Sequence, residues 1–207
     1  GNTVQAEVGA NLIDVAKRNN VNIPTLCYFK EMNPLATCRI CTVKVNGRHT
    51  TGCTVKVSEG MNVEVNSPSL LDNRRAIIEM LYAEGNHFCP TCEKSGNCDM
   101  QNHAYDMGLT VTRYPHVFSD KIVDFTPKRM IMESNRCILC KRCVEEVKSP
   151  DGKDVFSFVK RGVRTRVQID YKQEELLSEA EALRAMAICP VGAIGIEGGC
   201  RYGGVNR

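Results

Sequence analysis

The sequence contains no tryptophan, and aromatic residues make up only 6% of its 207 positions. It also contains no long apolar run, and its first twenty residues lack the hydrophobic stretch of a secretory signal. The most apolar segment, residues 185–196, is interrupted by Pro190 and two glycines and is too short to span a bilayer. These absences predict a cytoplasmic, reducing location and no transmembrane segment.

The motifs of nucleotide binding and of nucleophilic catalysis are also absent. The sequence has no G-x4-G-K-[ST] loop and no G-x-G-x2-G run followed by a helical pattern. It has no Ser-His-Asp or Cys-His set worth naming. We therefore expect no nucleotide-binding residue and no catalytic residue in this chain.

Cysteine, in contrast, is abundant, with 12 residues, and eleven of them fall into three groups. In a reducing compartment, clustered cysteines indicate metal binding more than disulfides. The candidate metal ligands, with one histidine ahead of the second group, are Cys27, Cys38, Cys41 and Cys53; His87, Cys89, Cys92 and Cys98; and Cys137, Cys140, Cys143 and Cys189.

The third group has the most specific spacing. Residues 137–143 read C-x2-C-x2-C, which places three thiolates on one tight loop, and Cys189-Pro190 supplies a distant fourth. Bacterial ferredoxins use C-x2-C-x2-C-x3-C-P twice to hold two 4Fe–4S clusters. The spacing therefore predicts one 4Fe–4S cluster, with a zinc knuckle as the alternative.

The ligands of a second ferredoxin cluster are missing from this section. Val147 stands where the first run would place its fourth cysteine. Counting back from Cys189, the positions of the other three thiols hold Ala185, Ala182 and Glu179. We interpret the section as a two-cluster ferredoxin fold reduced to one cluster, with a helix in the vacated place.

The first group, C-x10-C-x2-C-x11-C, has a longer first gap than the plant-type C-x4-C-x2-C ferredoxin pattern. It keeps the Cys38-Arg39-Ile40-Cys41 loop and a fourth cysteine, Cys53, on a following strand. Four thiolates hold a 2Fe–2S rhomb, two on each iron, so the spacing predicts such a cluster. A zinc site or ordinary buried cysteines are the alternatives.

The second group supplies only three cysteines, as C-x2-C-x5-C. A 4Fe–4S cluster needs a fourth ligand, and a neutral imidazole is a competent one. His87 is the nearest candidate, and His103 is the next residue to consider.

Local patterns predict the elements around these groups. Asn46-Gly47 between two apolar runs is a strong hairpin signal. The strands that we expect are 4–8, 40–45, 48–57, 61–65, 155–160 and 163–169. The expected helices are 11–16, a long one from Ser67-Pro68 to Gly85, and one from 172 to 188.

The formal charge of +3 does not indicate nucleic-acid binding. Ligating thiols lose their protons, and three oxidised clusters of this kind add about −5 in total. The loaded chain would therefore carry about −2, and we expect no nucleic-acid partner.

Together, these motifs resemble the iron–sulfur subunit shared by respiratory NADH dehydrogenases, NAD-reducing hydrogenases and NAD-dependent formate dehydrogenases. The segments that carry the resemblance are IPTLCY (23–28), CRIC (38–41), FCPTCEKSGNCDMQ (88–101), CILCKRC (137–143) and CPVGAI (189–194). The chain ends soon after Cys189, and in this it most resembles the diaphorase small subunits of soluble NAD-reducing nickel–iron hydrogenases.

The resemblance implies an α+β fold in three parts. These are a 2Fe–2S ferredoxin-like (β-grasp) domain over 1–66, a small helical His/Cys cluster domain over 67–115 and a 4Fe–4S bacterial-ferredoxin-like domain over 116–207. It implies one 2Fe–2S and two 4Fe–4S clusters on the eleven cysteines named above.

The implied function is electron relay without catalysis by this chain. The expected partners are a flavin- and NAD-binding diaphorase subunit and the hydrogenase small and large subunits. Alternatives are the equivalent relay beside a formate dehydrogenase catalytic subunit or in an NADH:quinone oxidoreductase-type complex. A zinc-stapled interaction module is a further alternative, of a different class.

Two departures from the family pattern bear on the ligand assignment. The family motif H-x3-C would place histidine at position 85, where this chain has Gly85, and His87 gives H-x-C instead. Ala36 stands where the family often has glycine, a change that is tolerated if the backbone there has negative φ.

Overall fold

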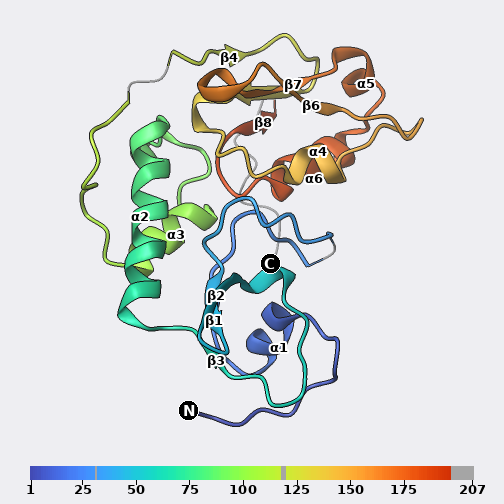
Figure 1. Cartoon of the computed structure of the whole chain (residues 1–207). Coiled ribbons are helices and arrows are strands. Elements are labelled where there is room, and N and C mark those ends of the chain that lie inside the picture. The colour runs from blue at the N-terminus through green and yellow to red at the C-terminus, as the bar shows by residue number, and fades with distance from the viewer. Residues whose placement is uncertain (31, 118–119, 197–207) are drawn as a thin grey trace. The chain divides into compact units, whose positions relative to one another are not determined.

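The computed structural model describes residues 1–30, 32–117 and 120–196, and Figure 1 shows the order of its elements. Within these residues the strands form three small sheets, with the orders β2-β1-β3, β4-β5-β8 and β6-β7. Every strand pairing among them is antiparallel. Antiparallel sheets combined with helices define the α+β class, so the predicted fold class is confirmed.

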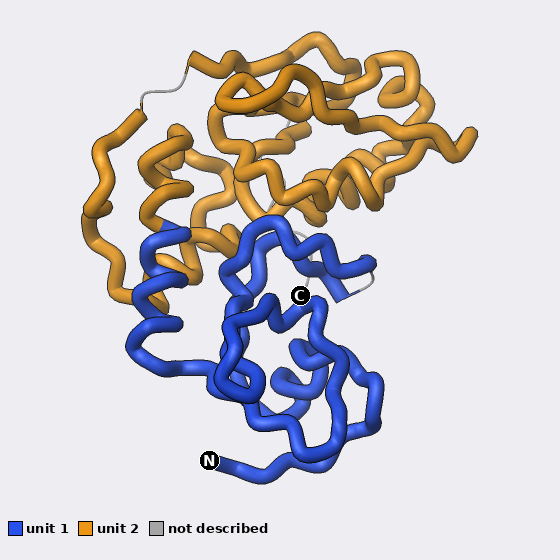
Figure 2. The backbone as a smooth tube through the Cα atoms, viewed as in Figure 1, with its two compact units in different colours: residues 1–78 blue, residues 79–207 orange. Residues whose placement is uncertain are grey.

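The backbone divides into two compact units, residues 1–78 and 79–207, which Figure 2 shows in different colours. The boundary falls inside helix α2 (Pro68–Glu84). The finer division into three domains therefore stays a prediction.

The first unit contains the predicted hairpin. Strands β1 (Thr42–Val45) and β2 (Arg48–Thr51) pair around Asn46-Gly47. Both turn residues have positive φ, 49° and 81°, as a tight hairpin turn requires. Strand β3 (Val63–Glu64) pairs with the other edge of β1.

Helix α1 (Leu12–Arg18) lies on the core of this unit. The side chain of Asn11 accepts the N–H of Ile13 and so caps the helix. Its apolar face packs with Ile23, Val43 and the cysteines Cys41 and Cys53. The predicted helix is confirmed, and the core that it helps to form includes two candidate metal ligands.

Two strand predictions in this unit are wrong. Residues 4–8 form no strand, and Val8 is 71% exposed, because no neighbouring strand pairs with this alternating segment among the described residues. The second arm of the hairpin ends at Thr51 rather than at residue 57. There the chain turns into a short 3-10 helix, η1 (Gly52–Thr54), which buries Cys53.

Helix α2 begins at Pro68 and ends before Gly85, as predicted. Leu70, Arg74 and Ile78 recur at helical spacing on one face and are 0%, 2% and 0% exposed. Further along the chain, η2 (Cys89–Thr91) and helix α3 (Asp99–Asp106) form around the second cysteine group. Helix α3 was not predicted, because its mostly polar sequence, DMQNHAYD, has too few apolar residues to show the spacing that would indicate a helix.

Within residues 120–196, the last section contains two sheets and three short α-helices, and α4 packs on α6 (Figure 1). The pair β6–β7 confirms the two predicted strands. The sheet β4-β5-β8 had no counterpart among the predictions. The bounds are β4 (Val123–Asp124), β5 (Met130–Glu133), η3 (Ser134–Arg136), α4 (Arg142–Glu146), β6 (Phe156–Val159), η4 (Gly162–Arg164), β7 (Arg166–Ile169), α5 (Tyr171–Glu175), α6 (Glu179–Ile188) and β8 (Ile194–Ile196).

The helix predicted over 172–188 is two helices, α5 and α6. Ser178 caps α6 in a capping box, in which its side chain accepts the N–H of Glu181 and the Glu181 carboxylate accepts the N–H of Ser178. In α6, Ala182 and Ala185 are fully buried, where the second cluster of a two-cluster ferredoxin would have thiols. This agrees with a helix that fills the vacated place.

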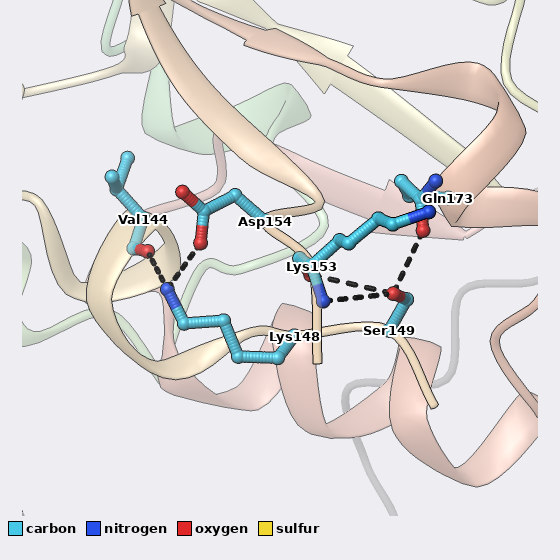
Figure 3. Close-up of polar contacts among 6 residues, drawn as sticks. All are labelled: Val144, Lys148, Ser149, Lys153, Asp154 and Gln173. Atoms are coloured by element: carbon cyan, nitrogen blue, oxygen red, sulfur yellow. Dashed lines mark hydrogen bonds and ion pairs between the residues drawn. The ribbon is translucent and has the colours of Figure 1, made fainter. Parts of the chain in front are cut away.

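The segment after α4 is closed by polar contacts (Figure 3). The Lys148 ammonium donates to the Val144 carbonyl at 3.1 Å and pairs with Asp154. The Ser149 hydroxyl contacts the Gln173 side-chain oxygen at 2.8 Å and the Lys153 backbone. These contacts hold the chain near Val147, where the ferredoxin run would continue to a fourth cysteine.

Candidate metal centres

The four cysteines of the first group form two contacting pairs. Cys27 and Cys38 lie close enough for each to shift the pKa of the other, and so do Cys41 and Cys53. Cys27, Cys41 and Cys53 are at most 1% exposed. Two close pairs match the ligand arrangement of a 2Fe–2S rhomb, with two thiolates on each iron, so these residues fit the predicted cluster.

In each pair, the pKa of one thiol is lowered and the pKa of the other is raised. The hydrogen bond from Cys38 lowers the pKa of Cys27 to about 5, and the pKa of Cys38 is raised by the same bond and by burial. The hydrogen bond from Cys53 lowers the pKa of Cys41 to about 7, while the pKa of Cys53 is raised. The pairing of the thiols therefore favours the loss of one proton from each pair, in the direction that metal binding requires.

The loop of residues 36–41 directs backbone N–H groups at these sulfurs. The N–H of Ala36 donates toward Cys53, and that of Ile40 toward Cys38. The loop takes this course through two left-handed residues, Ala36 (φ 52°) and Arg39 (φ 61°). The condition of negative φ at Ala36 is therefore not met, and the left-handed alanine costs about 1 kcal/mol.

A buried arginine lies beside the first group. Arg74 of α2 donates to the Thr42 carbonyl at 3.0 Å and to the Asn66 side-chain oxygen at 3.3 Å. Burial lowers the pKa of Arg74, and the Cys41 thiolate partly offsets that effect. Both hydrogen-bond acceptors of Arg74 are neutral oxygens, so they do not neutralise the charge of its guanidinium. One of them belongs to Thr42, the residue after the candidate ligand Cys41.

The second group surrounds the end of α2 and the start of α3. Cys89 lies in η2, Cys92 follows it, and Cys98 occupies the N-cap position of α3. Burial raises the pKa of the Cys98 thiol to about 11, and the nearby N–H groups of Gln101 and Met100 partly offset that effect, although Cys98 makes no side-chain capping hydrogen bond. The N-terminus of α3 therefore lies next to one of the three candidate ligands.

The imidazole of His87 lies among the same elements. Its ring meets the edge of the Tyr82 ring, with centroids 5.6 Å apart, and the Tyr82 hydroxyl is 4.0 Å from the Cys89 sulfur. Burial lowers the pKa of His87 to about 4, with smaller contributions from Arg136 and His116. A neutral imidazole is the form that ligates metal. The alternative ligand, His103, lies within α3.

All four cysteines of the third group line one pocket. Cys137 follows η3, Cys140 and Cys143 flank the start of α4, and Cys189 follows α6. Burial raises the pKa of Cys137 to about 11, and that of Cys140 and Cys143 further. Burial thus favours the protonated form of Cys137, Cys140 and Cys143, so cluster insertion must release protons there. Their neighbours in the pocket are Met132, Ile138, Lys141, Arg142, Val167, Val191, Ala193 and Ile194.

Contacts join the second and third groups. The N–H of Asp99 donates to the Pro190 carbonyl at 2.9 Å, on the residue after Cys189. Lys94, which is 4% exposed, donates to the Met186 carbonyl at 3.5 Å. Arg142 donates to the Ile188 carbonyl at 3.2 Å and pairs with Asp99. These polar groups hold the loop of one group on the loop of the other.

Arg74, Lys94 and Arg142 were missed from the sequence alone. Each makes at least one contact with a residue 32 to 92 positions away in the chain. The signal that could have drawn attention to Lys94 and Arg142 is their position inside the ligand loops.

In the part of the chain that the structure describes, no three His, Cys, Asp or Glu side chains converge closely enough to hold a single metal ion. No described helix is long and apolar enough to cross a membrane. Cys200 and the glycine-rich tail lie outside the described residues.

The fold and the cysteine groups define a class, namely proteins that carry several iron–sulfur clusters in ferredoxin-like domains. Three family models match in order along the chain. They are the 2Fe-2S iron-sulfur cluster binding domain over residues 1–68, the NADH-ubiquinone oxidoreductase-G iron-sulfur binding region over 74–113 and the ferredoxin-like domain of NADH-quinone oxidoreductase subunit 3 over 128–195. These matches support both 2Fe–2S and 4Fe–4S binding.

The chain is 47% identical over 195 residues to the gamma subunit of the NAD-reducing hydrogenase HoxS of Cupriavidus necator, covering 94% of this chain and 83% of that one. A chain in the crystal structure of an NAD+-reducing [NiFe]-hydrogenase in the H2-reduced state matches with a TM-score of 0.84 at 34% identity. The match covers 94% of this chain and 84% of that one. A subunit of an NADH-quinone oxidoreductase of Rhizobium meliloti is 34% identical over 197 residues, but the match spans only 23% of its length.

The chain belongs to the family of iron–sulfur subunits represented by the HoxS gamma subunit. The family predicted from the cysteine motifs is confirmed, and so are the ferredoxin-like domains at its two ends.

Proposed function

We propose that the chain is the electron-relay subunit of an NAD-linked hydrogenase, holding one 2Fe–2S and two 4Fe–4S clusters. The observation that carries the proposal is the order of three cysteine groups in one short chain, the first in the unit of residues 1–78 and the other two on joined loops of the unit of residues 79–207. The ligands are the eleven cysteines of these groups together with His87.

When bound, the clusters supply one-electron carriers. The chain's own residues hold them and set their surroundings. Buried cysteines fix the positions of the ligands, and backbone N–H groups aimed at the sulfurs stabilise negative charge. Apolar residues such as Met132 and Val167 keep water from the third group.

The proposed partners follow from the proteins to which the chain is similar. They are a flavin- and NAD-binding diaphorase subunit on one side and the hydrogenase subunits on the other, in the cytoplasm. This chain would contribute neither the nucleotide site nor the catalytic metal. The isolated chain should therefore neither oxidise NADH nor evolve hydrogen.

A second candidate is the equivalent relay subunit of an NADH:quinone oxidoreductase-type or formate dehydrogenase complex. The similarity to the Rhizobium meliloti protein over 93% of this chain favours it. Copurification distinguishes the two candidates, because only the hydrogenase complex would bring a nickel-containing subunit with the tagged chain.

Iron analysis of the anaerobically purified chain tests the cluster count. We expect a brown protein with about 10 iron atoms and three cluster signals by electron paramagnetic resonance (EPR). About six iron atoms with two signals would remove one cluster from the proposal. A colourless protein that contains zinc would support an interaction module instead.

A further inference from the structure

We propose that Gly85 is a positioning residue for the second cysteine group. Because position 85 has no side chain, the His87 imidazole can occupy the space where such a side chain would begin. The inference rests on the proposed function in one respect, namely that His87 is the fourth ligand of the middle cluster.

The contact leaves no room for a methyl group on Gly85. An ideal Cβ there would lie 2.5 Å from His87 Nε2, 2.8 Å from His87 Cδ2 and 2.9 Å from the Asn135 carbonyl oxygen. Protein interiors do not tolerate carbon contacts this short, so one of these groups would have to move. The Asn135 carbonyl accepts the N–H of Asn86 at 2.9 Å, which ties it in place. The His87 ring is therefore the group that would be displaced.

Backbone conformation does not explain the glycine. Gly85 is not among the residues with positive φ, and its N–H donates to the Leu81 carbonyl at 3.2 Å as α2 ends. An alanine could adopt this backbone. The requirement for glycine is one of space.

The turn after α2 brings His87 back over Gly85. The N–H of His87 donates to the Gly85 carbonyl at 3.1 Å, which closes a three-residue turn around Asn86. Tyr82 packs against the ring on one side, and the Cys89 thiol donates to the His87 carbonyl at 3.5 Å. The Tyr82 hydroxyl is 4.0 Å from the Cys89 sulfur, so Tyr82 links the position of the ring to the first cysteine of the group. Displacing the ring would therefore alter the set that His87 and Cys89 form together.

A side chain at position 85 is therefore incompatible with the observed position of the His87 ring. The present ring of His87 and any side chain at position 85 cannot occupy the same space. This explains how His87, in H-x-C spacing, can supply the ligand that H-x3-C spacing would supply from position 85. The glycine and the shifted histidine belong together.

The test compares full-length holo chains that carry Gly85→Ala, His87→Ala or both changes. We expect Gly85→Ala to alter the EPR signal of the middle cluster, giving a 3Fe signal or loss of that cluster, and to lower the iron content from about 10 toward about six. His87→Ala should give the same spectrum, and the double variant should add nothing to either single change. The matched control is Gly195→Ala, because a Cβ at Gly195 meets only the Ile131 Cβ, at an ordinary 3.7 Å.

An unchanged middle-cluster signal and iron content in Gly85→Ala would overturn the inference. Equal loss of all three clusters in that variant would overturn it as well, since it would assign Gly85 a role in folding. If Gly85→Ala alters the signal and His87→Ala does not, His87 is not the ligand and the positioning role is rejected with it. Failure of the proposed function has a different signature, because the unaltered chain would then contain zinc or fewer than three clusters.

Discussion

The sulfur of Cys92 lies against the backbone of Gly192, so closely that a Cβ on Gly192 would be 2.6 Å from it. Cys92 belongs to the second cysteine group, and Gly192 follows Cys189 of the third by three residues. Together with the hydrogen bond from Asp99 to Pro190, this contact sets the two ligand loops side by side. Short separation between centres is what a chain of electron carriers requires.

Gly192→Ala should disturb this contact. The added methyl group would push Cys92 away from the Cys189 loop, because the next neighbour, the Lys94 Cβ, would already be only 3.2 Å away. We expect loss or broadening of the middle-cluster EPR signal with little change in the 2Fe–2S signal. Gly195→Ala, in the strand that follows, serves as the control. Wild-type spectra for Gly192→Ala would mean that the loops can separate without consequence.

Much of the local structure could be predicted from the sequence. Asn46-Gly47 determines its hairpin by turn chemistry alone, and the apolar period of α2 extends over four turns. The ligand groups were predicted from spacing, because a tight loop is needed to place several thiolates on one cluster. In these cases a few neighbouring residues carry the whole signal.

The parts that could not be predicted depend on distant partners. Strands β4 and β8 have two and three residues, and β8 pairs with β5 across more than 60 residues of chain. Residues 4–8 alternate like a strand, yet no strand among the described residues pairs with them. The break before α6 had a local signal, the Ser178 capping box, which was overlooked. The roles of Arg74 and Gly192 appear only once the chain is folded.

Substitutions at Ala36 should show whether the first cluster depends on the left-handed backbone conformation of this residue. Ala36 has φ 52° and directs its N–H toward the Cys53 sulfur. Ala36→Gly should keep the 2Fe–2S signal, because glycine adopts this conformation freely. Ala36→Val should weaken or abolish it, since a β-branched residue is strongly disfavoured at positive φ. Visible circular dichroism and EPR of the first cluster provide the measurement, and equal spectra for both variants would contradict this account.

Arg74→Met should lower the reduction potential of the 2Fe–2S cluster. Reduction adds negative charge, which a buried guanidinium bonded to the Thr42 carbonyl stabilises. Loss of that charge should cost on the order of 1 kcal/mol, or roughly 50 mV for one electron. An EPR-monitored redox titration measures the shift, and the half-buried neighbour Arg75→Met is the control. Equal shifts in both variants would show that net charge, not the buried site, sets the potential.

The ligand at position 87 can be exchanged for a thiolate. His87→Cys should keep a 4Fe–4S signal but lower its potential, because a thiolate makes the cluster more negative than a neutral imidazole does. The low pKa of His87, about 4, keeps the wild-type imidazole neutral at ordinary pH, so the comparison is between a neutral and an anionic ligand. The measurement is the midpoint potential of the middle cluster. If potential and spectrum stay at their wild-type values, the fourth ligand lies elsewhere, and His103→Ala is the next variant to test.

Cys143→Ser tests whether the third group lies on the route between flavin and hydrogenase. In the assembled complex this change should abolish NADH-dependent hydrogen evolution, because Cys143 is one of the four thiols that line the pocket of the third group. Reduction of a dye at the flavin subunit should continue, since that reaction does not need the relay. Cys200→Ser removes a cysteine outside the three groups and serves as the matched control. Parallel loss of dye reduction in Cys143→Ser would show that the change disrupts assembly, whereas undiminished hydrogen evolution would place the third cluster off the electron route.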